Sequence, residues 1–247
     1  MELGLRGRTA IVSGASQGMG LAIAESLVGE GANVAMFARH RDTLVREAER
    51  LGALAVRGDL TTPKHLQELV DTTLEAFGGI DVLVLNGGGP PRATAAETTD
   101  EAVETAVDLL LLSSIRLVRL CLPHLEASGR GRVVAITSSS VREPIPNLAL
   151  SNAIRPGLVG WLKTLAREVG AAGVTVNVVA PGRIDTERLR EVYPDGPTEA
   201  DLRDIPLRRI GAPVEIGDVV CFLASDRASY VTGAVLPVDG GLTRGLL

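Results

Sequence analysis

Aromatic side chains are scarce in this chain, which has three Phe, two Tyr and one Trp among 247 residues. The hydrophobic interior must therefore be built from Ala, Val, Leu and Ile, a mixture that suits helices packed closely on a parallel sheet. Cysteine is also rare, and Cys121 and Cys221 lack the spacing of a metal site or a redox pair. We therefore expect no metal site and a reduced compartment.

Long apolar runs and basic clusters are missing as well. No stretch is long enough to span a bilayer, and Met1–Arg6 lacks the apolar centre of a signal peptide. The net charge of −5 at pH 7 gives no support for a nucleic-acid partner or a membrane-surface partner. These absences predict a soluble, cytoplasmic protein.

What the chain does have is a regular alternation of strand-like and helix-like patterns. Helical periodicity covers residues around 19–30, 41–51, 63–77, 98–126, 148–170 and 213–224. The predicted strands are Thr9–Ser13, Asn33–Ala38, Ala53–Gly58, Val82–Leu85, Arg132–Thr137, Thr175–Ala180 and Ala234–Val238. This alternation predicts an α/β fold, a Rossmann-like doubly wound parallel sheet of about seven strands with helices on both faces. Without a linker or repeat, residues 1–247 are expected to form one domain.

One segment departs from this alternation. Glu187–Ile210 is polar and contains Pro194, Pro197 and Pro206, so it resembles neither a strand nor a core helix. Long loops of this kind in compact domains commonly cover binding sites. We expect residues 187–210 to form an insertion that lies over a pocket as a substrate lid.

A glycine-rich turn, Ser13–Gly20, follows the first predicted strand and leads into a helical pattern at Leu21–Leu27. Glycines at a strand-to-helix junction allow a tight turn and a close approach to a ligand. The unpaired N–H groups and the positive dipole end of the helix then favour a pyrophosphate. An ordinary tight turn is the alternative, but the strand before and the helix after it favour nucleotide binding.

In such sheets the ligand lies beyond the carboxyl ends of the strands, so the residues after each strand carry information. Arg39 follows the second strand, where no Asp or Glu is available for a ribose 2′-hydroxyl. Its guanidinium can instead bind a 2′-phosphate, which favours NADP(H) over NAD(H), unless Arg39 is only a solvated cation. Asp59 and Leu60 follow the third strand. Asp59 can accept a hydrogen bond from an adenine amine, cap the next helix, or do both.

The motifs, taken in order, make the chain resemble the short-chain dehydrogenase/reductase family, and its bacterial 3-oxoacyl-carrier-protein reductases in particular. The matching segments are Ser13-Gly14-x-x-x-Gly18-x-Gly20, Asp59, Asn86-Gly87-Gly88, Pro181-Gly182-x-x-x-Thr186 and Val238-Asp239-Gly240-Gly241. The resemblance implies that the pyrophosphate is bound by Gly14, Ser16, Gln17, Gly18, Met19 and Gly20. It also implies that Asn86 and Gly87 support the adenosine ribose and the central strand, while Pro181, Gly182, Ile184 and Thr186 hold the nicotinamide amide.

The catalytic pattern of that family is largely replaced here. The family uses Asn, Ser, Tyr and Lys, with Tyr-x-x-x-Lys spacing and Ser thirteen positions before Tyr. Ser138 occupies the Ser position, but Ser151, Arg155 and Leu110 stand where Tyr, Lys and Asn are expected. A serine hydroxyl is a far poorer acid than a phenol, and arginine keeps its proton, so Arg155 can bind ribose hydroxyls but cannot join a proton relay by titration. Leu110 favours a drier site.

Ser151 has two open interpretations. It can hydrogen-bond a substrate oxygen, or it can be the N-cap of the helix around 148–170, since serine is a preferred cap. In the second case Pro156 falls just past the first turn and should distort it, because proline lacks an N–H and restricts the preceding Arg155.

Two functions remain open at this stage. The first is an NADP(H)-dependent oxidoreductase acting on a small carbonyl or alcohol substrate, in which Ser138 polarises the carbonyl, Arg155 fixes the ribose, and water or Ser151 handles the proton. The second is a catalytically impaired homologue that binds nucleotide as a sensor or a partner subunit. The resemblance also implies a homotetramer or dimer, because the family pairs the long helices equivalent to 98–126 and 148–170.

Overall fold

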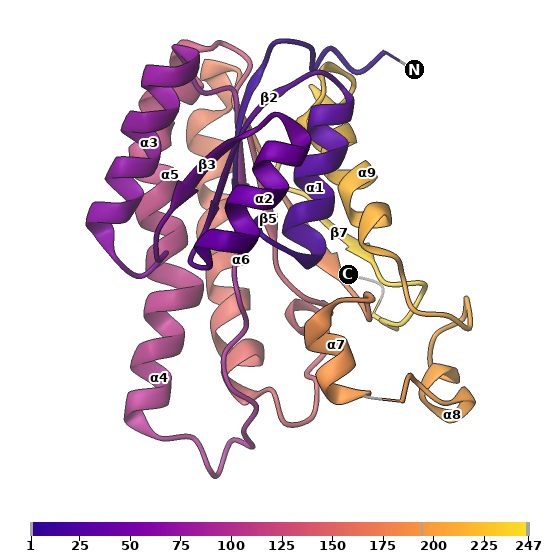
Figure 1. Cartoon of the computed structure of the whole chain (residues 1–247). Coiled ribbons are helices and arrows are strands. Elements are labelled where there is room, and N and C mark those ends of the chain that lie inside the picture. The colour runs from indigo at the N-terminus through magenta and orange to yellow at the C-terminus, as the bar shows by residue number, and fades with distance from the viewer. Residues whose placement is uncertain (1, 194, 246–247) are drawn as a thin grey trace.

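The computed structural model describes residues 2–193 and 195–245, which form one α/β domain around a seven-stranded parallel sheet (Figure 1). The strands are β1 (Thr9–Ser13), β2 (Asn33–Ala38), β3 (Leu54–Arg57), β4 (Val82–Leu85), β5 (Arg132–Ile136), β6 (Thr175–Pro181) and β7 (Val235–Val238). Their order in the sheet is β3-β2-β1-β4-β5-β6-β7. The predicted fold class is confirmed. The order reverses between β1 and β4, so the crevice for a ligand is expected beyond the ends of these two strands.

Helices cover both faces of the sheet. The long ones are α1 (Gly18–Gly29), α2 (Arg41–Leu51), α3 (Pro63–Phe77), α5 (Ser113–Ala127), α6 (Ala149–Val169) and α9 (Pro213–Ala224). One core cluster joins the sheet to apolar residues of α1, α2 and α9, and a second joins its other face to α3, α5 and α6. Few aromatic rings are needed, because aliphatic side chains and close helix contacts fill both layers.

The helical pattern at 98–126 is not one regular helix. It divides into α4 (Asp100–Val107), a π-helical turn at Asp108–Leu112, and α5. Within this turn the Ser113 hydroxyl donates to the Leu109 carbonyl oxygen at 2.6 Å. Periodicity alone could not reveal the π turn, since an extra residue per turn leaves the apolar composition unchanged. This turn presents Leu110, the residue at the family's Asn position, to the site.

The segment expected as a lid contains two short helices, α7 (Glu187–Val192) and α8 (Glu199–Leu202). Both lie on the side of the molecule that carries α4 and the first turns of α6, beyond the carboxyl ends of the strands (Figure 1). Thr198 and Asp201 form a reciprocal capping box on α8. The polar, proline-containing segment therefore forms two short helices, one of which has a capping box.

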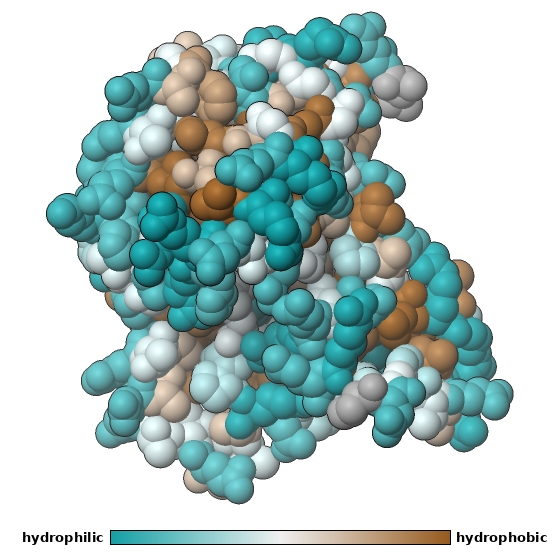
Figure 2. Space-filling view, viewed as in Figure 1, coloured by the Kyte–Doolittle hydropathy of each residue, from teal (hydrophilic) through white to brown (hydrophobic). Residues whose placement is uncertain are grey.

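The face seen in Figure 2 is mostly hydrophilic with small brown patches, and exposed large apolar side chains include Val214 and Phe222 of α9. Among the described residues, no helix combines the length and the apolar character that crossing a bilayer requires.

Candidate active site

Three glycines shape the loop between β1 and α1. Gly14 and Gly18 have φ values of +61° and +57°, in the left-handed region. A Cβ on Gly20 would lie 2.1 Å from the Gly14 carbonyl oxygen, so only glycine permits this approach. Gln17, at the N-cap of α1, forms no side-chain capping bond. The first N–H groups of α1 therefore remain available to an anion, and the loop fits the diphosphate of a dinucleotide.

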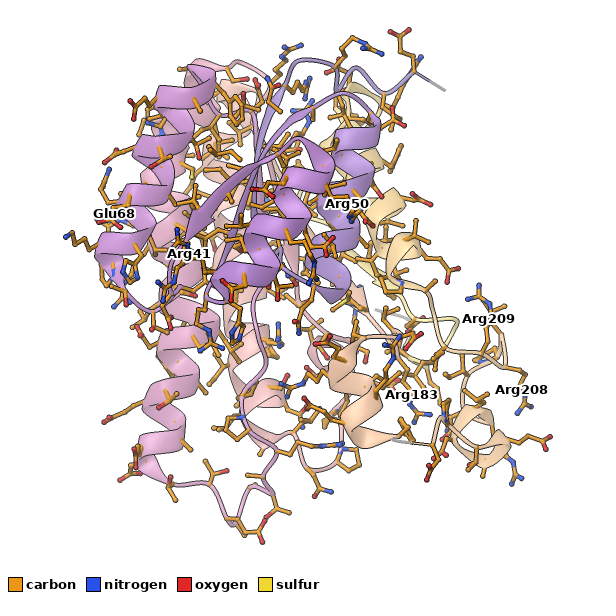
Figure 3. The ribbon with its side chains drawn as sticks, in the orientation of Figure 1. Arg41, Arg50, Glu68, Arg183, Arg208 and Arg209 are labelled. Atoms are coloured by element: carbon orange, nitrogen blue, oxygen red, sulfur yellow. The ribbon has the colours of Figure 1, made fainter. Side chains whose placement is uncertain are left out.

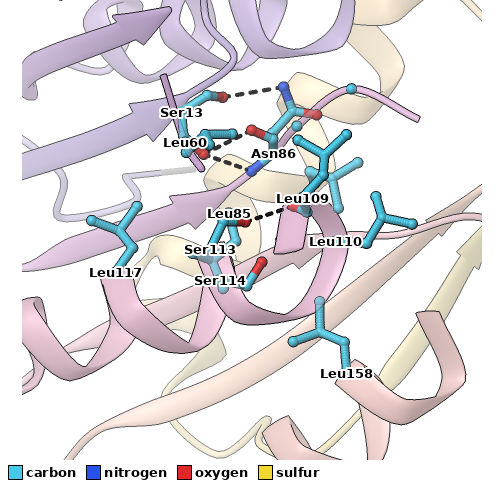
Figure 4. Close-up of a pocket in the computed structure, with 13 residues that line it drawn as sticks. Ser13, Leu60, Leu85, Asn86, Leu109, Leu110, Ser113, Ser114, Leu117 and Leu158 are labelled. Atoms are coloured by element: carbon cyan, nitrogen blue, oxygen red, sulfur yellow. Dashed lines mark hydrogen bonds between the residues drawn. The ribbon is translucent and has the colours of Figure 1, made fainter. Parts of the chain in front are cut away.

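Asn86 ties the ends of β1 and β4 together at the point where the strand order reverses. The Ser13 hydroxyl donates to the Asn86 carbonyl oxygen at 2.7 Å and accepts from the Asn86 N–H at 2.9 Å. The Asn86 amide group donates to the carbonyl oxygens of Ser13 and Gly14, at 3.1 and 3.2 Å (Figure 4). The implied support of the central strand by Asn86 is thus visible in its hydrogen bonds. Gly87 follows it and lies against Leu60.

Arg39 and Asp59 lie together at the open edge beside β2 and β3. Arg39 Nη1 is 3.8 Å from Asp59 Oδ2, and 68% of the Arg39 side chain is exposed. Asp59 Oδ1 accepts from the backbone N–H and the hydroxyl of Thr61, at 2.9 and 2.8 Å. Partial burial opposes ionisation of Asp59 most strongly, but the Thr61 hydrogen bonds and the Arg39 charge together hold the pKa of its carboxyl below its ordinary value.

The expectation that Asp59 caps the following helix is wrong in detail. Helix α3 has Thr62 at its N-cap and a proline in its first turn, and Thr62 forms no side-chain capping bond. Proline at this position has no N–H to satisfy, which lowers the need for a cap. Asp59 instead stabilises the turn before the helix through Thr61.

The segment after β6 returns to the glycine loop. Ile184 is buried, and Gly182 N donates to the Val238 carbonyl oxygen at 3.0 Å, which fixes the end of β6 against β7. Thr186 lies against Gly18, 3.3 Å from the position of a Cβ there. A groove of about 440 Å³ runs between the two segments, lined by residues that include Ser16, Gln17, Gly18, Asp185, Thr186 and Glu187. The structure thus brings together the residues expected to contact pyrophosphate and nicotinamide.

Ser138 follows β5 and is the N-cap of a short 3-10 turn, η2 (Ser139–Val141), where its hydroxyl oxygen accepts from Ser140 N at 3.1 Å. The Ser140 and Ser151 hydroxyl oxygens are 3.1 Å apart and both residues are buried. Arg155 Nε donates to Ser151 Oγ at 3.2 Å, and its Nη1 donates to the Ile136 carbonyl oxygen at 3.4 Å. The three expected catalytic residues therefore meet in one cluster, with Ser140 as the link.

The N-cap interpretation of Ser151 is wrong. Helix α6 begins at Ala149 with Leu148 at the N-cap, so Ser151 is its third residue. Asn152 fixes this start, because its amide exchanges two hydrogen bonds with the backbone of Ile145, at 3.1 and 2.9 Å. The helix continues through Pro156 to Val169 without a break, so Pro156 does not interrupt it as expected. Ser151 is free of a capping role and faces the Ser138–Ser140 turn.

Leu110 makes the opposite wall apolar. It packs in a small buried cluster with Ala106 of α4 and with Leu150 and Ile154 of α6. A pocket beside it is lined by Asn86, Leu109, Leu110 and Leu158 among others, with the leucines gathered below Asn86 (Figure 4). No polar side chain occupies the position where the family's Asn would lie.

A family model described as enoyl-(acyl carrier protein) reductase matches residues 14–243 of this chain. The chain is 35% identical over 238 residues to the 3-oxoacyl-[acyl-carrier-protein] reductase MabA of Mycobacterium tuberculosis, a match that covers 96% of this chain and 94% of MabA. The chain belongs to the short-chain dehydrogenase/reductase family.

Two solved structures of this family align closely with the chain. L-sorbose reductase from Gluconobacter frateurii, complexed with NADPH and L-sorbose, has a TM-score of 0.94 and 32% identity, with both chains covered completely. An NADPH-bound short-chain oxidoreductase from Pseudomonas aeruginosa PAO1, described as containing an atypical catalytic center, has a TM-score of 0.92 and 32% identity over 96% of this chain and 97% of its own. These relatives support an NAD(P)-dependent oxidoreductase acting on CH–OH groups.

Arg155 is the most unusual member of the site for a short-chain dehydrogenase/reductase. Burial lowers the pKa of its guanidinium to about 10, and the nearby charge of Arg188 adds to this effect. No carboxylate of residues 2–193 or 195–245 forms an ion pair with Arg155. The guanidinium is still charged at neutral pH, and its hydrogen bonds go only to neutral oxygens.

Sequence reasoning missed two residues of the site, Ser140 and Arg188. Ser140 is the third serine of the run Ser138–Ser140, and only the 3-10 turn brings its hydroxyl to Ser151. Arg188 lies two residues after Thr186, where it donates to the carbonyl oxygens of Gly89 and Pro90, at 3.2 and 2.8 Å. Its position two residues after Thr186 could have indicated a place near the site. Its contacts could not be predicted, because Gly89 and Pro90 are almost a hundred residues away in the sequence.

Proposed function

We propose that this protein is an NADPH-dependent reductase that converts a ketone to a secondary alcohol, without the phenol that its family uses. In this proposal the hydroxyls of Ser138 and Ser151 donate to the carbonyl oxygen, and the charge of Arg155 stabilises the alkoxide that forms. The observation that carries the proposal is the hydrogen-bonded cluster of Ser140, Ser151 and Arg155, which α6 places at the carboxyl end of β5. Preorganised donors and a fixed charge are what a developing oxyanion needs.

The hydrogen bonds around Ser151 leave one hydroxyl hydrogen that can be donated to a substrate. Arg155 Nε–H already points at Ser151 Oγ, and only one of the two serine hydrogens can lie between the Ser140 and Ser151 oxygens. Within the described part of the chain, the other hydroxyl hydrogen has no acceptor. When Ser140 donates to Ser151, the hydrogen of Ser151 is left for the cleft, and a substrate oxygen there would satisfy it. An unsatisfied buried donor costs about 1–3 kcal/mol, which such a substrate would recover.

The proton then comes from water. Bound NADPH supplies the hydride to the carbonyl carbon, and the electron pair of the C=O π bond moves to oxygen. Ser138, Ser151 and Arg155 hold the resulting alkoxide until a water molecule protonates it and hydroxide leaves to solvent. Neither serine titrates near neutrality, and Arg155 remains charged, so none of them needs to change protonation state.

Preference for NADPH over NADH is part of the proposal and depends on Arg39. Its side chain is exposed at the adenosine end of the crevice, and Asp59 is the nearest carboxylate, at 3.8 Å. Asp59 is turned toward Thr61 rather than toward a ribose hydroxyl. A 2′-phosphate would therefore meet a cation that is not held in a close ion pair.

The remaining expectations stay proposals as well. We infer that residues 187–210 act as the substrate lid, that 3-oxoacyl compounds are among the substrates to test first, and that the protein is a cytoplasmic homotetramer or dimer. MabA, with which the chain shares 35% of its residues over 238 positions, is named as a 3-oxoacyl reductase.

The test is NADPH oxidation with methyl acetoacetate and a panel of other ketones, followed by absorbance. Native protein should show turnover, and Ser151→Ala should reduce kcat by about ten- to a hundredfold with unchanged NADPH binding, because one oxyanion donor is lost. Thr164→Ala, an exposed hydroxyl on the same helix that donates to Gly160, is the control and should change neither quantity. NADPH binding without any oxidation would instead support the catalytically impaired homologue, acting as a sensor or partner subunit.

A further inference from the structure

Two arginines at the catalytic end of the crevice have no ion-pair partner among the described residues, unlike Arg190 and Arg209 nearby. In the described ranges 2–193 and 195–245, neither Arg155 nor Arg188 has a carboxylate oxygen within 4.0 Å. Arg190, on the same helix as Arg188, forms a bidentate pair with Asp185 at 3.0 and 3.1 Å. Arg209 pairs with Glu215 in the same way, at 2.7 Å for both contacts.

Position also separates these two arginines from the rest. Figure 3 shows Arg208 and Arg209 beside α8, and Arg183 between α7 and α8. Arg183 donates to the Asp201 carbonyl oxygen and Arg208 to that of Arg203, so both form hydrogen bonds to the backbone of the lid. Arg155, by contrast, lies under the site beside Ser151.

Arg188 crosses from α7 to the loop after β4. Its guanidinium lies directly on Gly89, because a Cβ there would be 2.7 Å from the Arg188 Cζ atom. It donates one hydrogen bond each to Gly89 O and Pro90 O. A guanidinium has further N–H donors in the same plane, and these have no partner among the described residues. The side chain therefore holds the lid helix to the opposite wall and still has donors to offer.

The charge of Arg188 reaches Arg155. Burial is the main cause of the lowered Arg155 pKa, and the Arg188 charge lowers it further. Arg155 is partly buried, where a charge acts through a lower effective dielectric than in bulk solvent, and Arg188 is exposed, so an anion can reach it. An arginine also matches a carboxylate in bidentate geometry. In the proposed function the glycine loop would hold the phosphates of NADPH, which leaves Arg188 for another anion.

We propose that the substrate is an anionic ketone, a small oxo acid whose carboxylate is bound by Arg188 beside the Ser138–Ser151 donors. This inference rests on the proposed reductase function and names its substrate class. A 3-oxo acid would give the corresponding 3-hydroxy acid, with hydride added at the carbonyl carbon and a proton taken from water. Arg155 would then face the alkoxide and Arg188 the carboxylate.

A binding experiment tests the substrate class without requiring turnover. Protein saturated with NADPH is titrated with 3-hydroxybutanoate or with its methyl ester, and heat is measured by calorimetry. Neither alcohol can be oxidised by the reduced cofactor, so only binding is observed. The acid should bind at least about tenfold more tightly than the ester, because only the carboxylate can accept charge-assisted hydrogen bonds from Arg188. Equal binding of acid and ester, or no binding of the acid, would overturn the proposal.

Variants of Arg188 distinguish binding of the carboxylate by its charge from its role in holding the lid helix. Arg188→Gln should remove the preference for the acid and Arg188→Lys should keep most of it. Arg50→Gln, a control outside the crevice, should keep all of it. If Arg188 only holds the lid, Arg188→Gln weakens acid and ester equally, and the inference fails. The two proposals can also fail separately. Binding of the acid without oxidation of NADPH by any ketone would contradict the reductase function alone, whereas ketone reduction with no acid preference would contradict the substrate class alone.

Discussion

The cofactor half and the catalytic half of the crevice are built on different principles. In the cofactor half, Gly14, Gly18 and Gly20 act through the absence of a side chain, and Asn86 binds only backbone atoms. In the catalytic half, Ser151 and Arg155 act through their functional groups, and both project from a regular helix. A helix accepts a different side chain without a change of its backbone path. The glycine loop does not, because a Cβ on Gly20 would lie 2.1 Å from the Gly14 carbonyl oxygen. The chemistry of this fold can therefore change while its cofactor cradle stays.

The largest effect that would follow from this contrast is at Gly20. A methyl group there would meet the Gly14 carbonyl oxygen at 2.1 Å and the Asn86 amide at 2.6 Å, and neither can move freely. We expect Gly20→Ala to weaken NADPH binding on the order of a thousandfold, about 4 kcal/mol. NADPH fluorescence titration measures this.

Gly160→Ala is the matched control, because a Cβ at that helical position has open space around it. It should bind NADPH normally and be as stable as the native protein or more stable by up to about 1 kcal/mol. Normal NADPH binding by Gly20→Ala would mean that the loop is not a cradle fixed by backbone contact.

The next effect concerns the dry wall of the catalytic half. Leu110→Asn restores the family's polar group but places an amide among Ala106, Leu150 and Ile154. We expect a loss of about 2–4 kcal/mol in the free energy of unfolding, because burial is lost and the amide lacks partners. Urea denaturation measures it. Leu112→Asn, at a position 37% exposed in the same π turn, should cost less than about 0.5 kcal/mol. Equal free energies of unfolding for the two variants would show that water reaches the side chain at position 110.

A smaller effect is expected at the adenosine edge. Arg39→Ala should weaken NADPH binding by about ten- to a hundredfold and leave NADH binding unchanged, since only the 2′-phosphate loses a charged donor. Parallel titrations with both cofactors measure the ratio. Arg50→Ala is the control, because Arg50 is paired with Glu25 and Glu47 on the outside of α1 and α2 (Figure 3). An unchanged NADPH-to-NADH ratio in Arg39→Ala would identify Arg39 as a solvated cation.

The smallest expected effect is that of pH near neutrality. Burial, assisted by Arg188, lowers the pKa of Arg155 to about 10, so its charge is complete at lower pH and is lost as the pH rises through that value. We expect kcat to stay level from about pH 6 to about pH 9 and to fall above that, because no phenol titrates in the site. Arg155→Lys should move the fall to lower pH. A native profile that changes between about pH 6 and about pH 8 would require another titrating group.

The sequence was a good guide wherever local pattern decides structure. All seven predicted strands lie close to their observed bounds, and the glycine loop follows from its place between a strand and a helix. The roles of Asn86 and of the segment from Pro181 to Thr186 are implied by the resemblance to the short-chain dehydrogenase/reductase family. These features depend on neighbours in the chain or on backbone geometry that only glycine allows.

Features set by distant contacts could not be predicted. The sequence is compatible with Ser151 as a helix cap. The hydrogen bonds between Asn152 and Ile145 fix the helix start, however, so that Leu148 is the N-cap. The link through Ser140 needs a 3-10 turn, and the contact of Arg188 with Gly89 joins segments that only the fold brings together. The same holds for the π turn at Leu110, which depends on packing against α6.

Hydride transfer without a phenol is tested by a single turnover with protein in excess over NADPH, in which methyl acetoacetate is added and NADPH absorbance is followed. The reaction is repeated with NADPH deuterated at the transferred position. All bound NADPH should be consumed, and deuteration should slow the loss, because hydride transfer occurs in a site without a phenol. Bound NADPH that persists unchanged in the presence of this ketone and of acetoacetate would contradict the proposed hydride transfer.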